Sequence, residues 1–140
     1  MLKKRFILKK TQVLITILLV VFSTINSQEK SNNLVTPPYL KQGDTIAIVA
    51  PAGILRGRKA TVDKAKKLAE SWGLKVVLGK NMFNQNNHFA GTDNERCQDF
   101  QDALDNPNIK AIWAARGGYG SVRILDKLDF NKFKKNPDFV

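Results

Sequence analysis

The sequence predicts an α/β fold, a Rossmann-like parallel sheet flanked by helices. A continuous β-prone apolar run occurs at 45–50, and short, mainly apolar strand segments occur at 74–78 and 110–115. Runs of this kind suit parallel strands that are covered on both faces. Stretches with apolar residues three or four positions apart separate the runs, as expected for amphipathic helices. An alternation of strand and helix favours a parallel sheet with right-handed crossovers.

The first predicted βαβ unit covers residues 43–78. Gly43-Asp44 forms a turn before the first strand, and the Pro51-Ala52-Gly53 segment ends that strand. The helix predicted over 61–72 is closed by Gly73, a common residue after a helix end. Its apolar positions are Val62, Ala65, Leu68, Ala69 and Trp72.

The second half of the chain predicts two further helices and a third strand. Thr92 and Glu95 have the spacing of a capping box and follow an asparagine-rich loop over 79–91. The helix that they begin carries Cys97, Phe100 and Leu104 on one face and ends near Asn106-Pro107. After the strand at 110–115, a short helix over 121–128 is predicted to face inward through Val122, Leu125 and Leu128.

The N-terminal residues predict a secretory signal peptide over 1–27. A basic start is followed by an apolar run at 13–22 and by small and polar residues up to Ser27. The apolar run is about half the length that a bilayer-spanning helix needs. A short uncleaved anchor is the alternative. Residues 28–42 form a polar leader, and we expect an exported protein in the periplasm or cell envelope without stable membrane insertion.

The net charge of +11 is weak support for a nucleic-acid partner. It arises from 23 lysines and arginines against 12 acidic residues, and five of the cations lie in the first ten residues. The basic residues elsewhere lack the interleaved exposed aromatic residues of a nucleic-acid platform, so no nucleic-acid partner is expected. The single cysteine, Cys97, excludes an intramolecular disulfide framework and a cysteine zinc cluster. The sequence predicts neither a metal site nor a cofactor.

The segment Arg116-Gly-Gly-Tyr-Gly-Ser121 is the strongest candidate for chemistry. It lies where the third strand turns into a helix, the edge at which open α/β sheets place ligands. Gly117, Gly118 and Gly120 permit a sharp turn that would hold the Ser121 hydroxyl clear of the sheet. The plainer interpretation is a serine that caps a helix. A phosphate loop is disfavoured, because the segment contains no G-x-G-x-x-G or G-K-[ST] pattern.

The other chemically notable side chains have plainer structural explanations. His88, the only histidine, lies in a polar loop and is expected to be solvated rather than catalytic. Cys97 is expected to be a small buried hydrophobe. Trp72 and Trp113 are expected to pack in the core.

Four motifs in register resemble the serine LD-carboxypeptidases, or muramoyltetrapeptide carboxypeptidases, and the related microcin-immunity peptidases. The resemblance runs from Tyr39 to Val140. The motifs are GDTIAIVAPA at 43–52; FAGTD at 89–93 with Glu95-Arg96; NPNIKAI at 106–112; and RGGYGS at 116–121 with RIL at 123–125 and LDF at 128–130. Residues 43–140 would then be the nucleophile domain, the truncated N-terminal part of a two-domain peptidase. Gly53 departs from the family, which often has serine there.

The resemblance implies hydrolysis of the bond between the L-centre of a diamino acid and a terminal D-alanine in cell-wall peptides. Ser121 matches the nucleophile that forms an acyl-enzyme, and the N–H of Val122 would help to stabilise the oxyanion. Tyr119 and Arg116, which flank the glycines, are the expected substrate contacts. Peptidoglycan-derived peptides are the expected partners, with a homodimer as an expected assembly of the full-length protein.

The family's catalytic histidine and glutamate come from a C-terminal domain that this sequence does not contain. His88 is not at the matching position. The 140-residue chain alone is therefore expected to be inactive, because an unassisted serine hydroxyl is a poor nucleophile. A non-catalytic wall-peptide binding module and an amidase resembling the microcin-immunity peptidases are the alternative functions.

Overall fold

A computed structural model describes residues 36–135, which belong to one compact unit. Its three-stranded parallel sheet has the order β2-β1-β3, so the first strand is central. The strands are β1 (Thr45–Val49), β2 (Lys75–Leu78) and β3 (Ile109–Ala114). The signal peptide predicted over 1–27, residues 28–35 of the predicted leader and residues 136–140 lie outside the described part.

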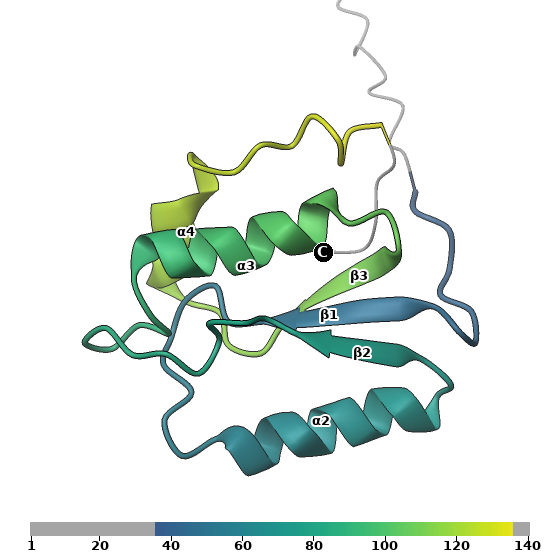
Figure 1. Ribbon diagram of the computed structural model, residues 1–140, viewed down its shortest axis with the longest axis horizontal. Coiled ribbons are helices and arrows are strands. Elements are labelled where there is room, and N and C mark those ends of the chain that lie inside the picture. The colour runs from purple at the N-terminus through teal and green to yellow at the C-terminus, as the bar shows by residue number, and fades with distance from the viewer. Residues whose placement is uncertain (1–35, 136–140) are drawn as a thin grey trace, which may run out of the picture. The chain divides into compact units, whose positions relative to one another are not determined.

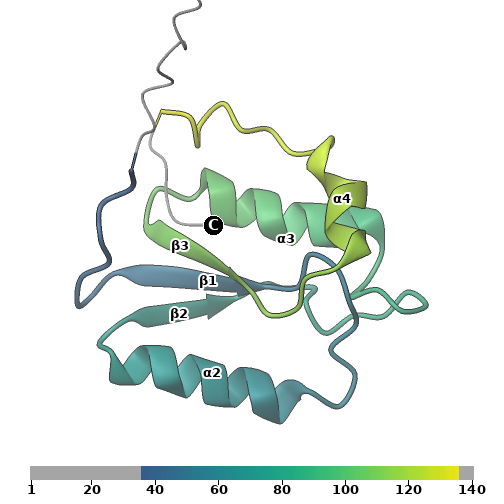
Figure 2. The same cartoon turned by 180° about the vertical axis from the view of Figure 1, so that it is seen from behind.

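Helices cover both faces of the sheet, as Figures 1 and 2 show. Helix α2 (Lys59–Ser71) lies on one face, whereas α3 (Asp93–Asp105) and α4 (Tyr119–Leu125) lie on the other. The elements follow one another as β1-α2-β2-α3-β3-α4. This arrangement confirms the predicted α/β fold with a parallel sheet. The described helices are too short or too polar to cross a lipid bilayer.

Strand β1 divides the core between the two faces. Its side chains alternate, so Ile46 and Ile48 pack on the side that carries α2, while Ala47 and Val49 pack on the side that carries α3. All four are at most 4% exposed. A strand buried on both faces explains the continuous apolar run in the sequence.

Helix α3 has the capping box that its sequence predicts. The Thr92 hydroxyl accepts a hydrogen bond from the Glu95 N–H, and the Glu95 carboxylate accepts one from the Thr92 N–H at 2.7 Å. These bonds pair donors at the helix N-terminus that have no partner within the helix. The start of α3, where Asp93 is the first helical residue, is therefore well defined.

The predicted inward face of α4 was wrong in two of its three positions. Val122 is 61% exposed and Leu125 is 48% exposed, whereas Gly120 and Ile124 are buried. The helix begins at Tyr119, and its contact with the rest of the unit is made through residues four positions apart, 120 and 124. Leu128 lies beyond the helix and packs, partly buried, against the core on the α3 side.

Both tryptophans are more exposed than expected. Trp72, which follows α2, is 56% exposed, and Trp113 on β3 is 39% exposed. Neither side chain belongs to the core of the described unit. The apolar pattern correctly predicts α2 and β3, but it does not predict the exposure of the tryptophans at the end of α2 and on β3.

Candidate active site

The candidate site lies at the carboxyl edge of the sheet, where the segments that follow β1 and β3 run side by side. The Ala115 N–H donates to the Val49 carbonyl at 2.8 Å, which continues the pairing of the two strands to this edge. The chain then enters the glycine turn and α4. Crevices at this edge of open parallel sheets commonly bind ligands.

The three glycines of the turn have different roles. Gly118 precedes α4 as its N-cap with φ +136°, a region that side chains rarely adopt. Gly120 lies so close to the segment after β1 that an added Cβ would be 2.7 Å from the Cα of Ala52. An added Cβ at Gly117 would meet no atom within 4 Å. The turn therefore requires glycine at 118 and 120 but has room for a side chain at 117.

Ser121 lies in the first turn of α4, where its side chain is half-buried. Its N–H donates to the Gly118 carbonyl at 3.0 Å, which ties the serine to the glycine turn. Within residues 36–135, the Ser121 hydroxyl makes no hydrogen bond of its own. Tyr119, two positions earlier, is 71% exposed.

Arg116 is held against the segment that follows β1. Its Nη1 donates to the Ile54 carbonyl at 2.8 Å, and its side chain passes so close to Gly53 that a Cβ there would be 2.9 Å from the arginine Cδ. The family's serine at position 53 would meet this side chain, so glycine at 53 fits the position of Arg116. The sequence did not predict this contact.

Arg96 is a buried cation that the sequence analysis quoted in a motif without assigning it a role. It is 2% exposed on α3, and its guanidinium donates to three groups. Nε bonds the Pro51 carbonyl at 3.0 Å, Nη1 the Gly91 carbonyl at 2.6 Å and Nη2 the Asp93 carboxylate at 2.6 Å. Arg96 thus joins the segment after β1 to the start of α3.

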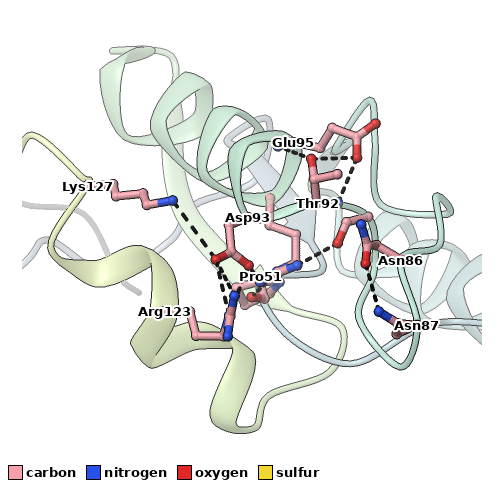
Figure 3. Close-up of polar contacts among 10 residues, drawn as sticks. Pro51, Asn86, Asn87, Thr92, Asp93, Glu95, Arg123 and Lys127 are labelled. Carbon is pink, nitrogen blue, oxygen red and sulfur yellow. Dashed lines mark hydrogen bonds and ion pairs between the residues drawn. The ribbon is translucent and has the colours of Figure 1, made fainter.

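Asp93 connects α3 to α4. Arg123 of α4 donates to it from Nε, 3.1 Å from each carboxylate oxygen, and from Nη2 at 2.8 Å, while Lys127 Nζ is 4.0 Å away (Figure 3). The hydrogen bonds from Arg123, aided by Arg96, lower the pKa of Asp93 from 3.8 to about 2, although burial opposes the shift. The same bonds raise the pKa of Arg123.

We expect the contribution of Asp93 to stability to disappear in acid. Because folding lowers its pKa, this contribution is present above the unfolded value of 3.8 and is lost as the pH falls through about 2. Urea unfolding of the wild type and of Asp93→Asn across this range measures it. The wild type should be the more stable at pH 7, and the difference should shrink between about pH 4 and pH 2. A difference that does not vary with pH would contradict this expectation.

Asp99 holds the start of the asparagine-rich loop. This 5% exposed carboxylate of α3 accepts hydrogen bonds from the backbone and the side chain of Asn81, both at 2.9 Å. Burial raises the pKa of Asp99, while the bonds from Asn81 act in the opposite direction. Arg96 holds the other end of the loop through Gly91, so both ends are attached to α3.

His88 and Ser121 form no catalytic pair among the described residues. His88 is exposed and its ring lies 4.3 Å from that of Phe89, and no hydrogen bond among the described residues joins it to Ser121. Cys97 is half-buried and free. Within residues 36–135, no three His, Cys, Asp or Glu side chains lie close enough together to hold a metal ion.

The parallel sheet, with a glycine turn and charged side chains at its carboxyl edge, defines an α/β domain of the kind on which enzyme sites are commonly built. The chain belongs to the LD-carboxypeptidase N-terminal domain family, which matches residues 46–140. A Bacillus subtilis relative described as a "Probable murein peptide carboxypeptidase" is 38% identical over 101 residues. That match covers 72% of this chain and 31% of the relative. The chain therefore spans about a third of the length of the curated relatives that it matches.

Solved structures of this family share the fold. A muramoyltetrapeptide carboxypeptidase from Oxalobacter formigenes has a TM-score of 0.58 and 33% identity, covering 67% of this chain and 31% of its own. The microcin C7 self-immunity protein MccF has a TM-score of 0.68 and 29% identity, covering 75% of this chain and 31% of its own. MccF has also been solved with aspartyl sulfamoyl adenosine, and as an active-site mutant with alanine in place of a serine, an asparagine and a lysine.

Proposed function

We propose that this chain is the nucleophile-bearing part of a serine LD-carboxypeptidase that removes the terminal D-alanine from murein tetrapeptides. Membership of the LD-carboxypeptidase family and the names of its relatives support the substrate class. The observation that carries the proposal is the position of Ser121. Its hydroxyl lies in the first turn of α4, next to a glycine turn at the carboxyl edge of the sheet, with no hydrogen-bond partner among the described residues.

In the proposed reaction, Ser121 Oγ attacks the carbonyl carbon of the bond between the diamino acid and D-alanine. The hydroxyl proton passes to a general base and then to the leaving amine, so D-alanine departs and an ester to Ser121 remains. Water then hydrolyses the ester and restores the hydroxyl. The N–H of Val122 is the proposed oxyanion donor, and Tyr119 and Arg116 are the proposed substrate contacts.

The general base and its acidic partner are proposed to come from the rest of the protein, because the relatives are about three times as long as the match. No described residue forms a hydrogen bond with the Ser121 hydroxyl, and we therefore propose that the 140-residue chain alone is inactive. Export is part of the same proposal and rests on the sequence of residues 1–27.

The substrate assignment is tested with the protein expressed from its complete reading frame. We expect D-alanine release from a tetrapeptide that ends in D-alanine after an L-centre, and none from the same peptide ending in L-alanine. A pentapeptide with a terminal D-alanyl-D-alanine is a second control that should be left intact. No release from the D-alanine tetrapeptide, or release from the pentapeptide alone, would overturn the proposal. Binding of the tetrapeptide without release would instead favour the wall-peptide binding module.

A second candidate is an amidase that acts on peptidyl nucleotides. The observation that favours it is the TM-score of 0.68 with MccF, against 0.58 with the solved carboxypeptidase. Parallel assays with an aminoacyl sulfamoyl nucleoside and with the tetrapeptide separate the two. Cleavage of the nucleoside conjugate alone would establish the second candidate.

A further inference from the structure

An ion pair between Arg123 and Asp93 anchors α4, the helix that carries Ser121, to the start of α3. Arg123 lies two residues after the serine. It donates to the Asp93 carboxylate from Nε at 3.1 Å and from Nη2 at 2.8 Å. A forked arginine–carboxylate contact fixes direction as well as distance, because both groups are planar. Arg123 and Asp93 have 44% and 22% of their side-chain surface exposed, so this contact lies at the surface and is free of the cost of full burial.

The same carboxylate is also connected to the segment that follows β1. Asp93 accepts from Arg96 at 2.6 Å, and Arg96 in turn reaches the Pro51 carbonyl, in the segment that follows β1. Asp93 therefore links that segment to α4 through side chains, in addition to the direct contact of Gly120 with Ala52. Figure 3 shows the carboxylate between the two helices, with Arg123 and Lys127 pointing toward it.

The ring of Phe89 supports the same alignment. The guanidinium carbons of Arg96 and Arg123 lie 4.7 and 5.4 Å from the ring centroid. The ring also meets α4 at Gly120, where an added Cβ would be 2.9 Å from its Cδ1. The first turn of α4 therefore packs against Phe89 and Ala52 through Gly120, and the Arg123–Asp93 pair holds the same helix one turn later.

We propose that Asp93 is a positioning residue for Ser121: through Arg123 it fixes the orientation of α4 relative to the segment after β1, and so the direction of the serine hydroxyl. This inference rests on the proposed function of Ser121. A nucleophile displaced by about 1 Å can lose a hundredfold in rate, so the orientation of one short helix has a large effect. Asp93 acts through Arg123 and need not touch the substrate.

The test measures kcat and KM for the tetrapeptide in the protein expressed from its complete reading frame. We expect Asp93→Asn and Arg123→Gln each to lower kcat between about tenfold and hundredfold, with KM changed by less than about threefold. The double variant should be no slower than the slower single variant, because both changes break one interaction. Arg123→Lys keeps the charge but not the fork, so its kcat should remain low.

Lys127→Gln is the matched control. Lys127 is 4.0 Å from the same carboxylate and forms no hydrogen bond with it, so kcat should be unchanged. Each assay is run well below the unfolding temperature of the variant. If Asp93→Asn does not fold, the kcat values of Arg123→Gln and Arg123→Lys, both at a surface residue, test the positioning role.

Three results would overturn the inference: wild-type kcat in the Arg123 variants, independent and additive losses in the double variant, or a rise in KM alone. Ser121→Ala, assayed in parallel, separates this failure from that of the proposed function. If Ser121→Ala is inactive while the Asp93 and Arg123 variants retain full kcat, only the positioning role is wrong. If Ser121→Ala retains activity, the proposed nucleophile is itself wrong.

Discussion

Replacing Ser121 with alanine is expected to lower kcat for D-alanine release by about 10⁴-fold or more in the full-length protein. The acyl-enzyme cannot form without the hydroxyl, and losing the nucleophile of a serine peptidase has an effect of this size. Folding should be unaffected. Alanine is a better helix former than serine, and the Ser121 hydroxyl has no hydrogen bond to lose among the described residues.

The measurement is D-alanine release together with thermal unfolding. Ser71→Ala is a matched control, because Ser71 also lies on a helix and its hydroxyl donates only to the Leu68 carbonyl of α2, at 2.7 Å. The control should retain wild-type kcat. Activity that survives in Ser121→Ala, in a protein that unfolds at the wild-type temperature, would show that another residue performs the reaction.

Gly120→Ala is expected to destabilise the protein and to lower kcat by about a hundredfold. Helix propensity alone predicts the opposite sign, since alanine in a helix is favoured over glycine by about 1 kcal/mol. The added Cβ, however, would lie 2.7 Å from the Cα of Ala52 and 2.9 Å from the Phe89 ring. Relief of that overlap requires α4 to move, at a cost of about 1–3 kcal/mol. The movement carries Ser121 with it.

Gly117→Ala supplies the comparison within the same turn. An added Cβ at Gly117 meets nothing within 4 Å, so stability and kcat should remain close to the wild type. Urea unfolding and steady-state kinetics on the two variants measure the difference. Equal effects at 117 and 120 would mean that the turn responds to lost flexibility rather than to the close approach of α4 to Ala52.

Local sequence patterns predicted the elements of this fold correctly. Thr92 and Glu95 mark the start of α3, and the bonds between them are present. The apolar run at 45–50 corresponds to β1, the strand buried on both faces. Each prediction depends on neighbours within a few residues of one another, and such neighbours interact in the same way wherever the element packs.

Contacts between distant segments could not be predicted in this way. Arg96 bonds the Pro51 carbonyl, 45 residues away, and Arg123 bonds the Asp93 carboxylate, 30 residues away. Arg96 does lie one helical turn from Asp99 and Phe100 on α3, so its inward face could have been read from the 3.6-residue period. A hydrophobicity pattern, however, treats an inward-facing arginine as a polar surface residue. Its hydrogen-bond partners can be identified only from the three-dimensional positions of the loops.

The orientation of α4 was mispredicted for a related reason. Val122 and Leu125 are apolar and suitably spaced, but Gly120, a residue with no side chain, makes the closest contact. Hydrophobicity patterns give little weight to a glycine. The backbone approach to Ala52 therefore turned Ile124 inward in place of the two larger patterned residues.

The asparagine-rich loop is attached to α3 at Asn81, Asn84 and Gly91, and its residues 83–88 are exposed. Mutations in that exposed stretch alter a surface that ends beside Phe89 and leave the bonds of Asp99 and Arg96 intact. Substitutions or insertions in this exposed stretch can therefore change the surface of the loop without altering the sheet and helices beneath it. Among homologues, differences in ligand preference should accumulate there sooner than in the turn that carries the serine.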